Sequence, residues 1–174
     1  MGTSAALIAL GVVVLILVLV YNGLVSARLR VREAWSAIDV QLQRRASLIP
    51  TLVESVKGYA EYERETLRKV VEARNALGGA SGPRAAAAAN DQLTGALTAF
   101  FALAEAYPDL KANERFAQLQ RDLTDTENKV AYARNYYNGA VETYNIKVES
   151  VPGVLIAGPL RFVRAEFFGE EPLG

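Results

Sequence analysis

The chain has 174 residues, enough for one domain with a hydrophobic core once a membrane segment is subtracted. Its 19 basic and 19 acidic side chains cancel, which removes the basic surplus that a nucleic-acid partner usually requires. With no cysteine and no histidine, the chain lacks disulfides, thiolate nucleophiles, zinc fingers and imidazole bases. We predict no nucleic-acid partner, no cofactor and no metal site.

The amino-terminal segment carries no charge before Arg28. As a helix, residues 5–25 extend about 30 Å at about 1.5 Å per residue, which matches the hydrocarbon core of a bilayer. The segment is therefore predicted to be a transmembrane anchor over residues 1–27. A cleaved signal peptide is the alternative, because "VSA" at 25–27 offers small residues, but the basic region that precedes the apolar part of such peptides is missing.

The residues that flank this span predict its orientation. Tyr21 suits the membrane interface, and Arg28, Arg30 and Arg32 follow directly. Because basic flanks stay on the cytoplasmic side, we predict a single-pass protein of the cell (inner) membrane, with its amino terminus outside and the rest of the chain cytoplasmic.

A stripe of mainly apolar residues, spaced alternately by three and four, follows the span. It comprises Val31, Trp35, Ile38, Leu42, Arg45, Ile49, Leu52, Val56, Tyr59, Glu63, Thr66, Val70, Ala73 and Leu77. The stripe predicts one long helix over residues 28–77. Pro50 removes one backbone donor within it but does not shift the phase, which predicts a bend rather than a break.

Three charged residues lie on or beside this stripe. Arg45 falls on the stripe itself, while Asp39 and Arg44 lie next to it. A buried arginine needs a partner and tends to fix the register of packing. Alternatively, its stem packs against the core and its guanidinium reaches solvent. The sequence leaves both possibilities open.

Two further helices follow. "GGASGP" at 78–83 ends the first helix, and Pro83 suits the first position of a second helix that reaches residue 106. Residues 108–113 form a predicted extended connection with Asn113 as N-cap of a third helix, which runs to about residue 150. Since no two-residue alternation occurs, we predict an all-α fold: an anchor continuing into an antiparallel bundle of three long helices over 28–150, and an apolar tail over 151–174 with a short helical segment.

Few residues suggest chemistry. Carboxylates are the only acid/base groups, and a helical di-metal site would need Glu-x-x-His pairs that a chain without histidine does not have. "GGASGP" lacks the Lys-Ser/Thr of a phosphate-binding loop. Two Tyr-Asn pairs, at 137–138 and 144–145, lie one heptad apart, and core packing is their predicted role. We therefore predict a non-enzymatic protein; a carboxylate-only metal enzyme is the most distant alternative.

Several blocks resemble the LemA family of bacterial single-pass membrane proteins. They are "YNGLV" (21–25), "VREAWSAIDVQLQRRASLIPTLVESVKGYAEYERETL" (31–67), "AEAYPDLKANERFAQLQRDLTDTENKVAYARNYYNGAVETYN" (104–145) and "GVLIAG" (153–158). The resemblance implies a membrane-anchored helical bundle, with family genes often near HtpX-type membrane metalloproteases. It supplies no catalytic residues.

Helix lengths add a prediction about assembly. A helix over 28–77 extends about 75 Å, whereas the second helix and its connection return only about 55 Å, which leaves residues 28–40 without a partner in the chain. We therefore predict a homo-oligomer joined through Val31, Trp35, Ile38, Leu42, Arg44 and Arg45. A second contact at the distal tip is predicted for Phe162, Phe167 and Phe168.

The predicted function is that of a membrane-anchored, non-enzymatic helical scaffold that self-associates at the lipid bilayer. The alternative is an adaptor or regulator of an HtpX-type membrane metalloprotease.

Overall fold

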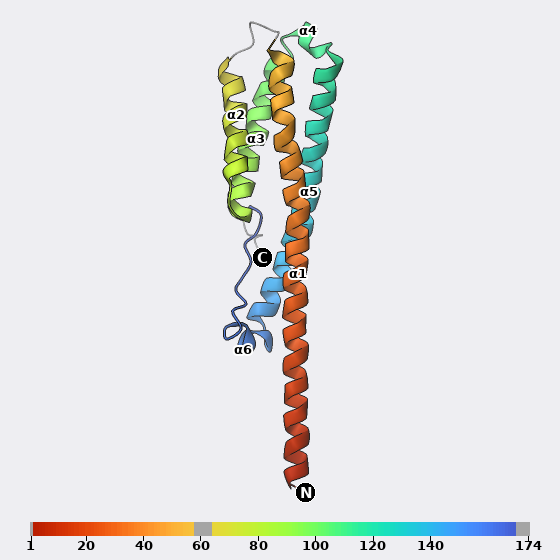
Figure 1. Cartoon of the computed structure of the whole chain (residues 1–174), viewed down its shortest axis with the longest axis vertical. Helices are drawn as coiled ribbons and strands as arrows, with labels where there is room; N and C mark the ends of the chain where they lie inside the picture. Colours follow the sequence, from red (N-terminus) through yellow and green to blue (C-terminus); the bar gives the residue numbers. More distant parts are fainter. Residues whose placement is uncertain (1, 58–63, 170–174) are drawn as a thin grey trace.

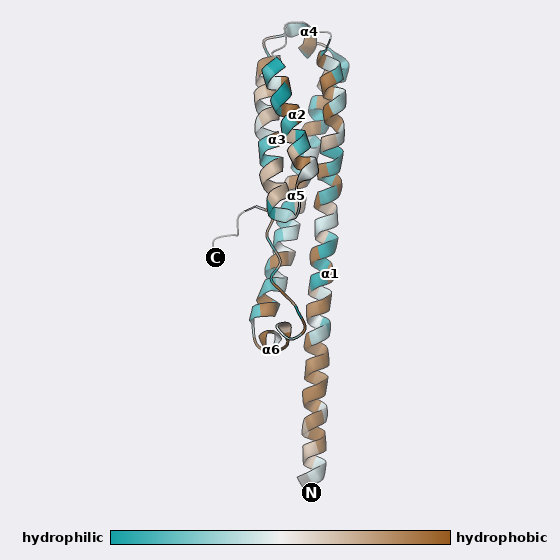
Figure 2. Ribbon diagram, turned by 60° about the vertical axis from the view of Figure 1, so that its left-hand side comes forward, coloured by the Kyte–Doolittle hydropathy of each residue, from teal (hydrophilic) through white to brown (hydrophobic). Residues whose placement is uncertain are grey.

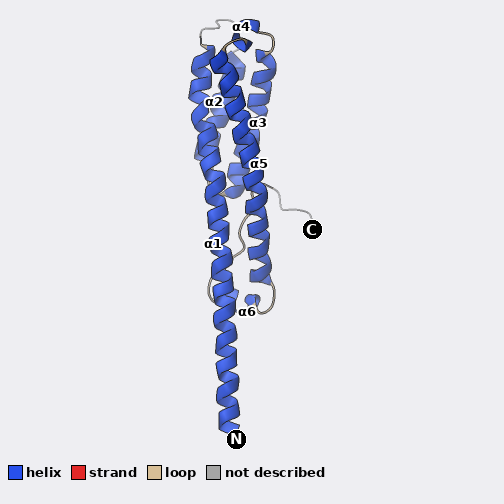
Figure 3. Ribbon diagram, turned by 90° about the vertical axis from the view of Figure 1, so that its right-hand side faces the viewer, coloured by secondary structure: helices blue, strands red, loops and turns tan. Residues whose placement is uncertain are grey.

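Every regular element of the computed structural model, which describes residues 2–57 and 64–169, is a helix (Figure 3). The helices are α1 (Gly2–Val56), α2 (Arg64–Gly79), α3 (Pro83–Ala104), α4 (Pro108–Lys111), α5 (Glu114–Glu149) and α6 (Gly153–Ala157). The predicted all-α class is confirmed.

Helix α1 passes from an isolated apolar end into the bundle without interruption (Figure 1). Residues 3–19 are exposed, and the helix is long enough, and at this end apolar enough, to cross a membrane (Figure 2). From Leu24 onward, one face of the same helix is buried, at Leu24, Ala27, Val31 and Ala34. The apolar span and the bundle core are therefore parts of one helix, with no linker between them.

The half of the bundle far from this apolar end contains four antiparallel helices (Figures 1 and 2). Helices α1 and α3 run in one direction and α2 and α5 in the other, with α4 across the far end (Figure 1). The core between them is aliphatic and aromatic. The ring of Phe100 is fully buried, and its centroid lies 5.4 Å from that of Phe101 and 6.2 Å from that of Phe116. We call this part the distal half.

The predicted single helix over 28–77 is wrong, because α1 ends at Val56 and α2 returns antiparallel from Arg64. The stripe stays in phase across the reversal because Val56 and Val70, both buried, are separated by two whole heptads. Its positions at 59 and 63 lie outside the described residues. The bundle therefore has four long helices instead of three. Helix α1 continues through Pro50 as predicted, while a bend there stays a prediction.

Local signals fixed the ends of the other long helices. Pro83 occupies the first turn of α3, as predicted, and follows Gly82, whose φ of 86° suits glycine. Asn113 caps α5, since its side-chain oxygen accepts a hydrogen bond of 3.2 Å from the Phe116 amide.

The predicted extended connection before α5 is wrong. Pro108–Lys111 forms the helical turn α4, and Pro108 fits there because proline is tolerated in the first turn of a helix.

The half of the bundle nearest the apolar span, which we call the proximal half, contains α1 and α5 but neither α2 nor α3 (Figure 1). Helix α5 descends beside α1, α6 lies at its lower end, and the chain then climbs back along α5 (Figures 1 and 3). A Cβ atom on Gly153 would lie 1.9 Å from the carbonyl oxygen of Lys147, so only glycine permits this reversal. We call the climbing segment, residues 163–168, the strap.

Candidate functional site

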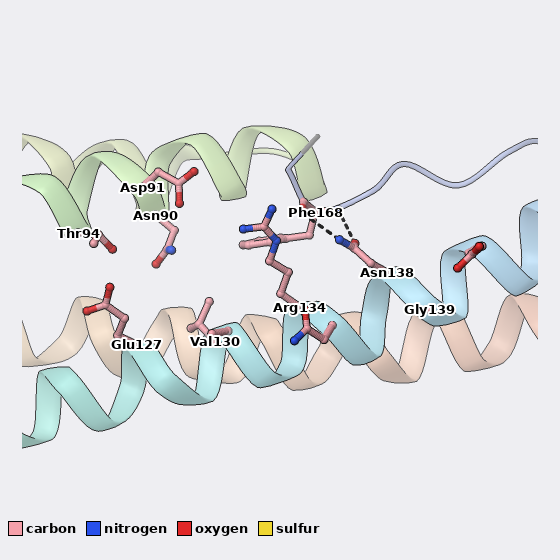
Figure 4. A pocket seen from close by; sticks show the side chains of 12 residues that line it. Asn90, Asp91, Thr94, Glu127, Val130, Arg134, Asn138, Gly139 and Phe168 are labelled. Atoms are coloured by element: carbon pink, nitrogen blue, oxygen red, sulfur yellow. Dashed lines mark hydrogen bonds between the residues drawn. The ribbon is translucent and has the colours of Figure 1, made fainter. Parts of the chain in front are cut away.

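Two asparagine side chains of α5 bind the backbone of the strap. The Asn145 amide donates to the Ala165 carbonyl at 3.1 Å and accepts from the Ala165 N–H at 2.8 Å. Asn138 repeats this arrangement with Phe168, at 3.3 and 2.9 Å (Figure 4). Each amide thereby replaces the paired hydrogen bonds that a neighbouring β-strand would supply to an extended segment.

The spacing of the two asparagines matches the rise of the strap. Asn138 and Asn145 are seven residues apart, about 10.5 Å along a helix at 1.5 Å per residue. The residues they bind, Ala165 and Phe168, are three apart, about 10 Å in an extended chain at about 3.3 Å per residue. An extended segment antiparallel to α5 therefore meets an asparagine at each end.

The tyrosine that precedes each asparagine adds a third hydrogen bond. Tyr137 donates its hydroxyl to the Glu166 carbonyl at 2.8 Å, and Tyr144 donates to the Val163 carbonyl at 2.9 Å. Burial raises the pKa of Tyr137 to about 12, and the charge of Glu166 acts in the same direction. Burial also raises the pKa of Tyr144, although the charge of Arg28 opposes it. Both phenols therefore stay protonated and able to donate at neutral pH.

Aromatic side chains of the strap region close the proximal core. The Trp35 ring centroid lies 5.7 Å from that of Tyr137 and 6.3 Å from that of Phe168, which is 1% exposed. Nearer the apolar span, Phe162 packs edge-on against Tyr21 at 5.9 Å. Phe168 of the strap and Phe162 just before it therefore supply the rings that α2 and α3 do not provide at this level.

A polar groove of about 660 Å³ lies between α3 and α5 and begins where the strap ends (Figure 4). Asp91 and Asn90 project from α3, and Glu127 and Arg134 from α5. Phe168 borders the groove at the strap end. The groove thus continues the line of extended chain that α5 already binds.

Arg45 of α1 lies beneath the groove and is 1% exposed. Its guanidinium donates to Asn90 at 2.6 Å and to Thr94 at 2.9 Å, and it lies 3.4 Å from the Glu127 carboxylate. Burial lowers the pKa of Arg45, while the charges of Glu127 and Asp91 oppose this, and a guanidinium remains charged in any case. The buried and paired alternative is therefore the one that the structure adopts.

The residues predicted for self-association lie mostly inside the chain's own core. Val31, Ile38 and Leu42 are buried, and Trp35 is half-buried against the strap. Arg44 is exposed and lies 3.6 Å from Asp125 of α5. Residues 28–40 do have a partner within the chain, contrary to the prediction, because the chain reverses after Val56 and α5 then leads back to Gly153, which lies beside Leu24.

The predicted distal contact is also misplaced. Phe162, Phe167 and Phe168 are buried against the proximal half and not displayed at the distal tip. The tail reverses next to the apolar span, at α6, and climbs back along α5 instead of continuing away from the bundle (Figure 1).

Neither the strap contacts nor the groove were found from the sequence. A signal existed: each asparagine directly follows a tyrosine of the α5 stripe, and a buried amide must find hydrogen-bond partners. Among the described residues, no group of three or more acidic side chains is placed to hold a metal ion.

The described residues form an all-α bundle continuous with an apolar amino-terminal helix, an architecture that is compatible with a single-pass membrane protein. The family model described as "LemA family" matches residues 34–172, so the chain belongs to the LemA family.

Among curated relatives, the chain is 28% identical to Magnetosome protein MamQ 2 of Paramagnetospirillum magneticum, over 88% of this chain and 66% of that protein. It is 24% identical to Magnetosome protein MamQ of Magnetospirillum gryphiswaldense over the same shares. Protein LemA of Metamycoplasma hominis is 28% identical over 73% of this chain and 58% of that protein. The chain thus spans about two thirds of the length of the MamQ relatives.

Proposed function

We propose that the protein is a membrane-anchored, non-enzymatic helical scaffold. The observation that carries this proposal is the continuity of α1 from its exposed apolar stretch to the buried Leu24, Ala27 and Val31. A helix shared by anchor and core holds the bundle at a fixed height above the bilayer, as a scaffold requires. The names of the MamQ relatives refer to the magnetosome and state no reaction, which agrees with a structural role.

The non-enzymatic part rests on the state of the charged groups at the groove. Arg45 is held by Asn90, Thr94 and Glu127. Ion pairs elsewhere, such as Arg68 with Glu65 at 2.7 Å, are exposed pairs within one helix. An acid or base for catalysis would need a perturbed group directed into a cleft. Metal analysis of the purified full chain tests this point, and stoichiometric bound metal would contradict it.

We also propose that the protein self-associates, but through a different surface from the residues of α1 that the sequence predicted. Val40 on α1 and Tyr132 and Tyr136 on α5 are 55%, 80% and 57% exposed. A shallow pocket lined by Ala37 and Tyr132 joins the two helices on one face. Tyrosines are enriched at interfaces between proteins, because they bury a large area at a small entropic cost. We call Val40, Tyr132 and Tyr136 the tyrosine face, and its proposed occupant is a second copy of the chain.

The test is the mass of the full chain in detergent, measured by light scattering. Wild type should be a discrete oligomer, and changing Tyr132 and Tyr136 to Ser should reduce it to a monomer with unchanged helical content. Val71→Ser on α2, another exposed apolar residue, is the matched control and should keep the assembly. A monomeric wild type would end the self-association proposal. Changing Trp35 and Ile38 to Glu would not test it, because Ile38 is fully buried and a carboxylate there would unfold the core.

The proposed location is the cell (inner) membrane, with the bundle cytoplasmic. Arg28, Arg30 and Arg32 at the bundle side of the span support this orientation through the preference of basic flanks for the cytoplasm. Protease added to intact spheroplasts should leave the bundle whole, whereas digestion from outside would reverse the orientation.

A second candidate function is an adaptor for an HtpX-type membrane metalloprotease. The observation in its favour is the groove that continues beyond Phe168, because α5 already binds extended chain just before it. A purified protease of this type that binds the wild-type chain, but not a chain with Arg134→Ala in the groove, would favour the adaptor. Equal binding to both would exclude the groove as its site.

A further inference from the structure

The lower end of the bundle lies at the level of the last turns of the apolar span. The Lys147 ammonium is 3.5 Å from the Gly23 carbonyl oxygen, and the Phe162 ring packs on Tyr21. If residues 5–25 fill about 30 Å of hydrocarbon, residues 20–25 occupy its last 8 Å or so. Helix α6 and the segments beside it therefore reach the membrane surface.

Five apolar side chains are exposed at this level. The exposed fractions are 78% for Val151, 45% for Val154, 69% for Leu155, 49% for Leu160 and 71% for Val163. All lie within thirteen consecutive residues, 151–163, which we call the foot. Apolar residues gathered in this way mark an interaction surface. The surface is continuous with the exposed apolar part of α1, whose occupant is lipid.

Exposed basic side chains lie near the foot. They are Arg28 and Arg32 of α1, Lys147 of α5 and Arg161 of the foot itself. Nearby, Glu149 lies 3.3 Å from Arg164 and is thereby neutralised. A rim of cations around apolar side chains is the pattern of an element that lies in the interface of an anionic membrane.

One pocket is suited to a lipid headgroup. It measures about 240 Å³ and is lined by Tyr21, Arg28 and Arg32 of α1 together with Leu160 and Phe162 of the foot. The Arg28 guanidinium lies 5.9 Å from the centre of the Phe162 ring, a cation–π contact that holds it at the pocket. Arg28 and Arg32 are four residues apart and so lie on one face of α1. Two guanidinium groups with a phenol beside them can bind a phosphate.

We propose that the foot is a second membrane attachment: its exposed apolar side chains enter the headgroup region of the bilayer that α1 crosses, and the Arg28–Arg32 pocket binds the phosphate of an anionic phospholipid. The proposal rests on the membrane anchor of the proposed function. With two points of attachment, the bundle is fixed in tilt and rotation as well as in height, so its tyrosine face and groove keep one orientation to the membrane.

The chain has no cysteine, so a single introduced cysteine can carry a spin label without background. We would place the label at Leu155→Cys in the full chain, reconstituted in nanodiscs of phosphatidylcholine and phosphatidylglycerol. Its accessibility to oxygen relative to a water-soluble nickel chelate should be several-fold higher than at Val71→Cys, an exposed position on α2 outside the tyrosine face. Val12→Cys, within the apolar span, gives the value for a lipid-facing residue.

Any other result would overturn the proposed membrane contact of the foot. If the label at Leu155→Cys is as accessible to nickel as the label at Val71→Cys, while Val12→Cys is lipid-facing, the proposed membrane contact of the foot is wrong and the anchor stands. A Leu155 label shielded from both reagents would indicate protein cover, such as a second copy, and would also overturn the foot. Nickel access at Val12→Cys would overturn the anchor and the foot together.

The headgroup pocket has its own test. Native mass spectrometry of the chain released from the same nanodiscs should show retained phosphatidylglycerol, and changing Arg28 and Arg32 to Gln should reduce that retention several-fold. Arg30→Gln is the matched control, because Arg30 is exposed on the same stretch of α1 but does not line the pocket. Equal retention in all variants, or equal loss in the control, would overturn the pocket.

Discussion

The distal and proximal halves of the bundle share α1 and α5 but complete the core between them in different ways. In the distal half, α2 and α3 satisfy their own backbones and contribute only side chains, such as Val70 and Leu93, both fully buried. In the proximal half, the strap is extended and cannot form the hydrogen bonds of a helix within itself, and Asn138 and Asn145 of α5 supply partners for its backbone. The comparison shows that one helix can pack against other helices and also against an extended segment, provided that amide side chains beside its apolar stripe bind the backbone of the extended segment.

The difference has a thermodynamic consequence. Distal stability depends mainly on apolar burial, which any variant with a smaller side chain weakens. The proximal half depends in addition on specific side-chain donors and acceptors, whose loss strands buried backbone groups. The strap should therefore detach locally under conditions that leave the four distal helices folded.

The largest effect is expected from Phe100→Ala in the distal core. Its ring is fully buried between Phe101 and Phe116, and removing it leaves a cavity that costs about 3–5 kcal/mol of unfolding free energy. Thermal unfolding in detergent, followed by circular dichroism, should show a single large drop in midpoint. Val71→Ala, at an exposed position on α2 outside the tyrosine face, should change the unfolding free energy by less than about 0.5 kcal/mol. Comparable shifts for the two would contradict a core held by Phe100.

Removing both amides, Asn138→Ala with Asn145→Ala, should release the strap. Each change strands one buried backbone pair at a cost of about 1–3 kcal/mol. Hydrogen exchange at residues 163–168 should rise by orders of magnitude, while α2 and α3 keep their protection. Asn135→Ala, an exposed asparagine of the same helix, is the control and should change nothing. Equal loss of protection in α3 would mean that the two halves unfold together.

High pH should act on the proximal half through Tyr137. Its pKa is raised to about 12 in the folded chain, so the stabilisation is fully present below about pH 10 and is lost as pH rises through 12. A rise of this size in the pKa corresponds to a contribution on the order of 2 kcal/mol to the free energy of unfolding. Exchange of the strap should accelerate above pH 10 beyond the intrinsic chemical rate. Tyr137→Phe should remove that step, and its persistence would assign the effect to another group.

Sequence patterns gave the parts of this fold that depend on neighbouring residues. The apolar span, Pro83 at the start of α3 and Asn113 as a cap act within a few residues, so they could be identified without the fold. The reversal after Val56 could not, because two heptads separate it from Val70 and one helix or two fit that spacing equally well. The predicted number of long helices depended on this choice, and so did the predicted self-association through residues 28–40.

The candidate site was hidden for a different reason. Asn138 and its partner Phe168 are thirty residues apart, and Arg45 and Asn90 forty-five, so no local pattern joins them. Only the charge of Arg45 on an apolar stripe and the amides beside stripe tyrosines signalled that partners were needed. Such signals identify a residue that needs a hydrogen-bond or ion-pair partner, but only the fold shows which residue that partner is.

The smallest effect is expected from Glu127→Gln, at the boundary between the two halves. Its carboxylate lies 3.4 Å from Arg45, and removing one partner of a buried charge can cost several kcal/mol. Here two observations oppose that outcome: the Glu127 side chain is 46% exposed, so solvent already screens the pair, and Asn90 and Thr94 keep their hydrogen bonds to the guanidinium. We expect a loss below about 1 kcal/mol, larger at low salt than at high salt. Unfolding measured at both salt concentrations checks this, with Glu142→Gln, an exposed glutamate on the same groove, as the control. A loss of about 3 kcal/mol at either concentration would show that Arg45 depends on the carboxylate and not on the two neutral side chains of α3.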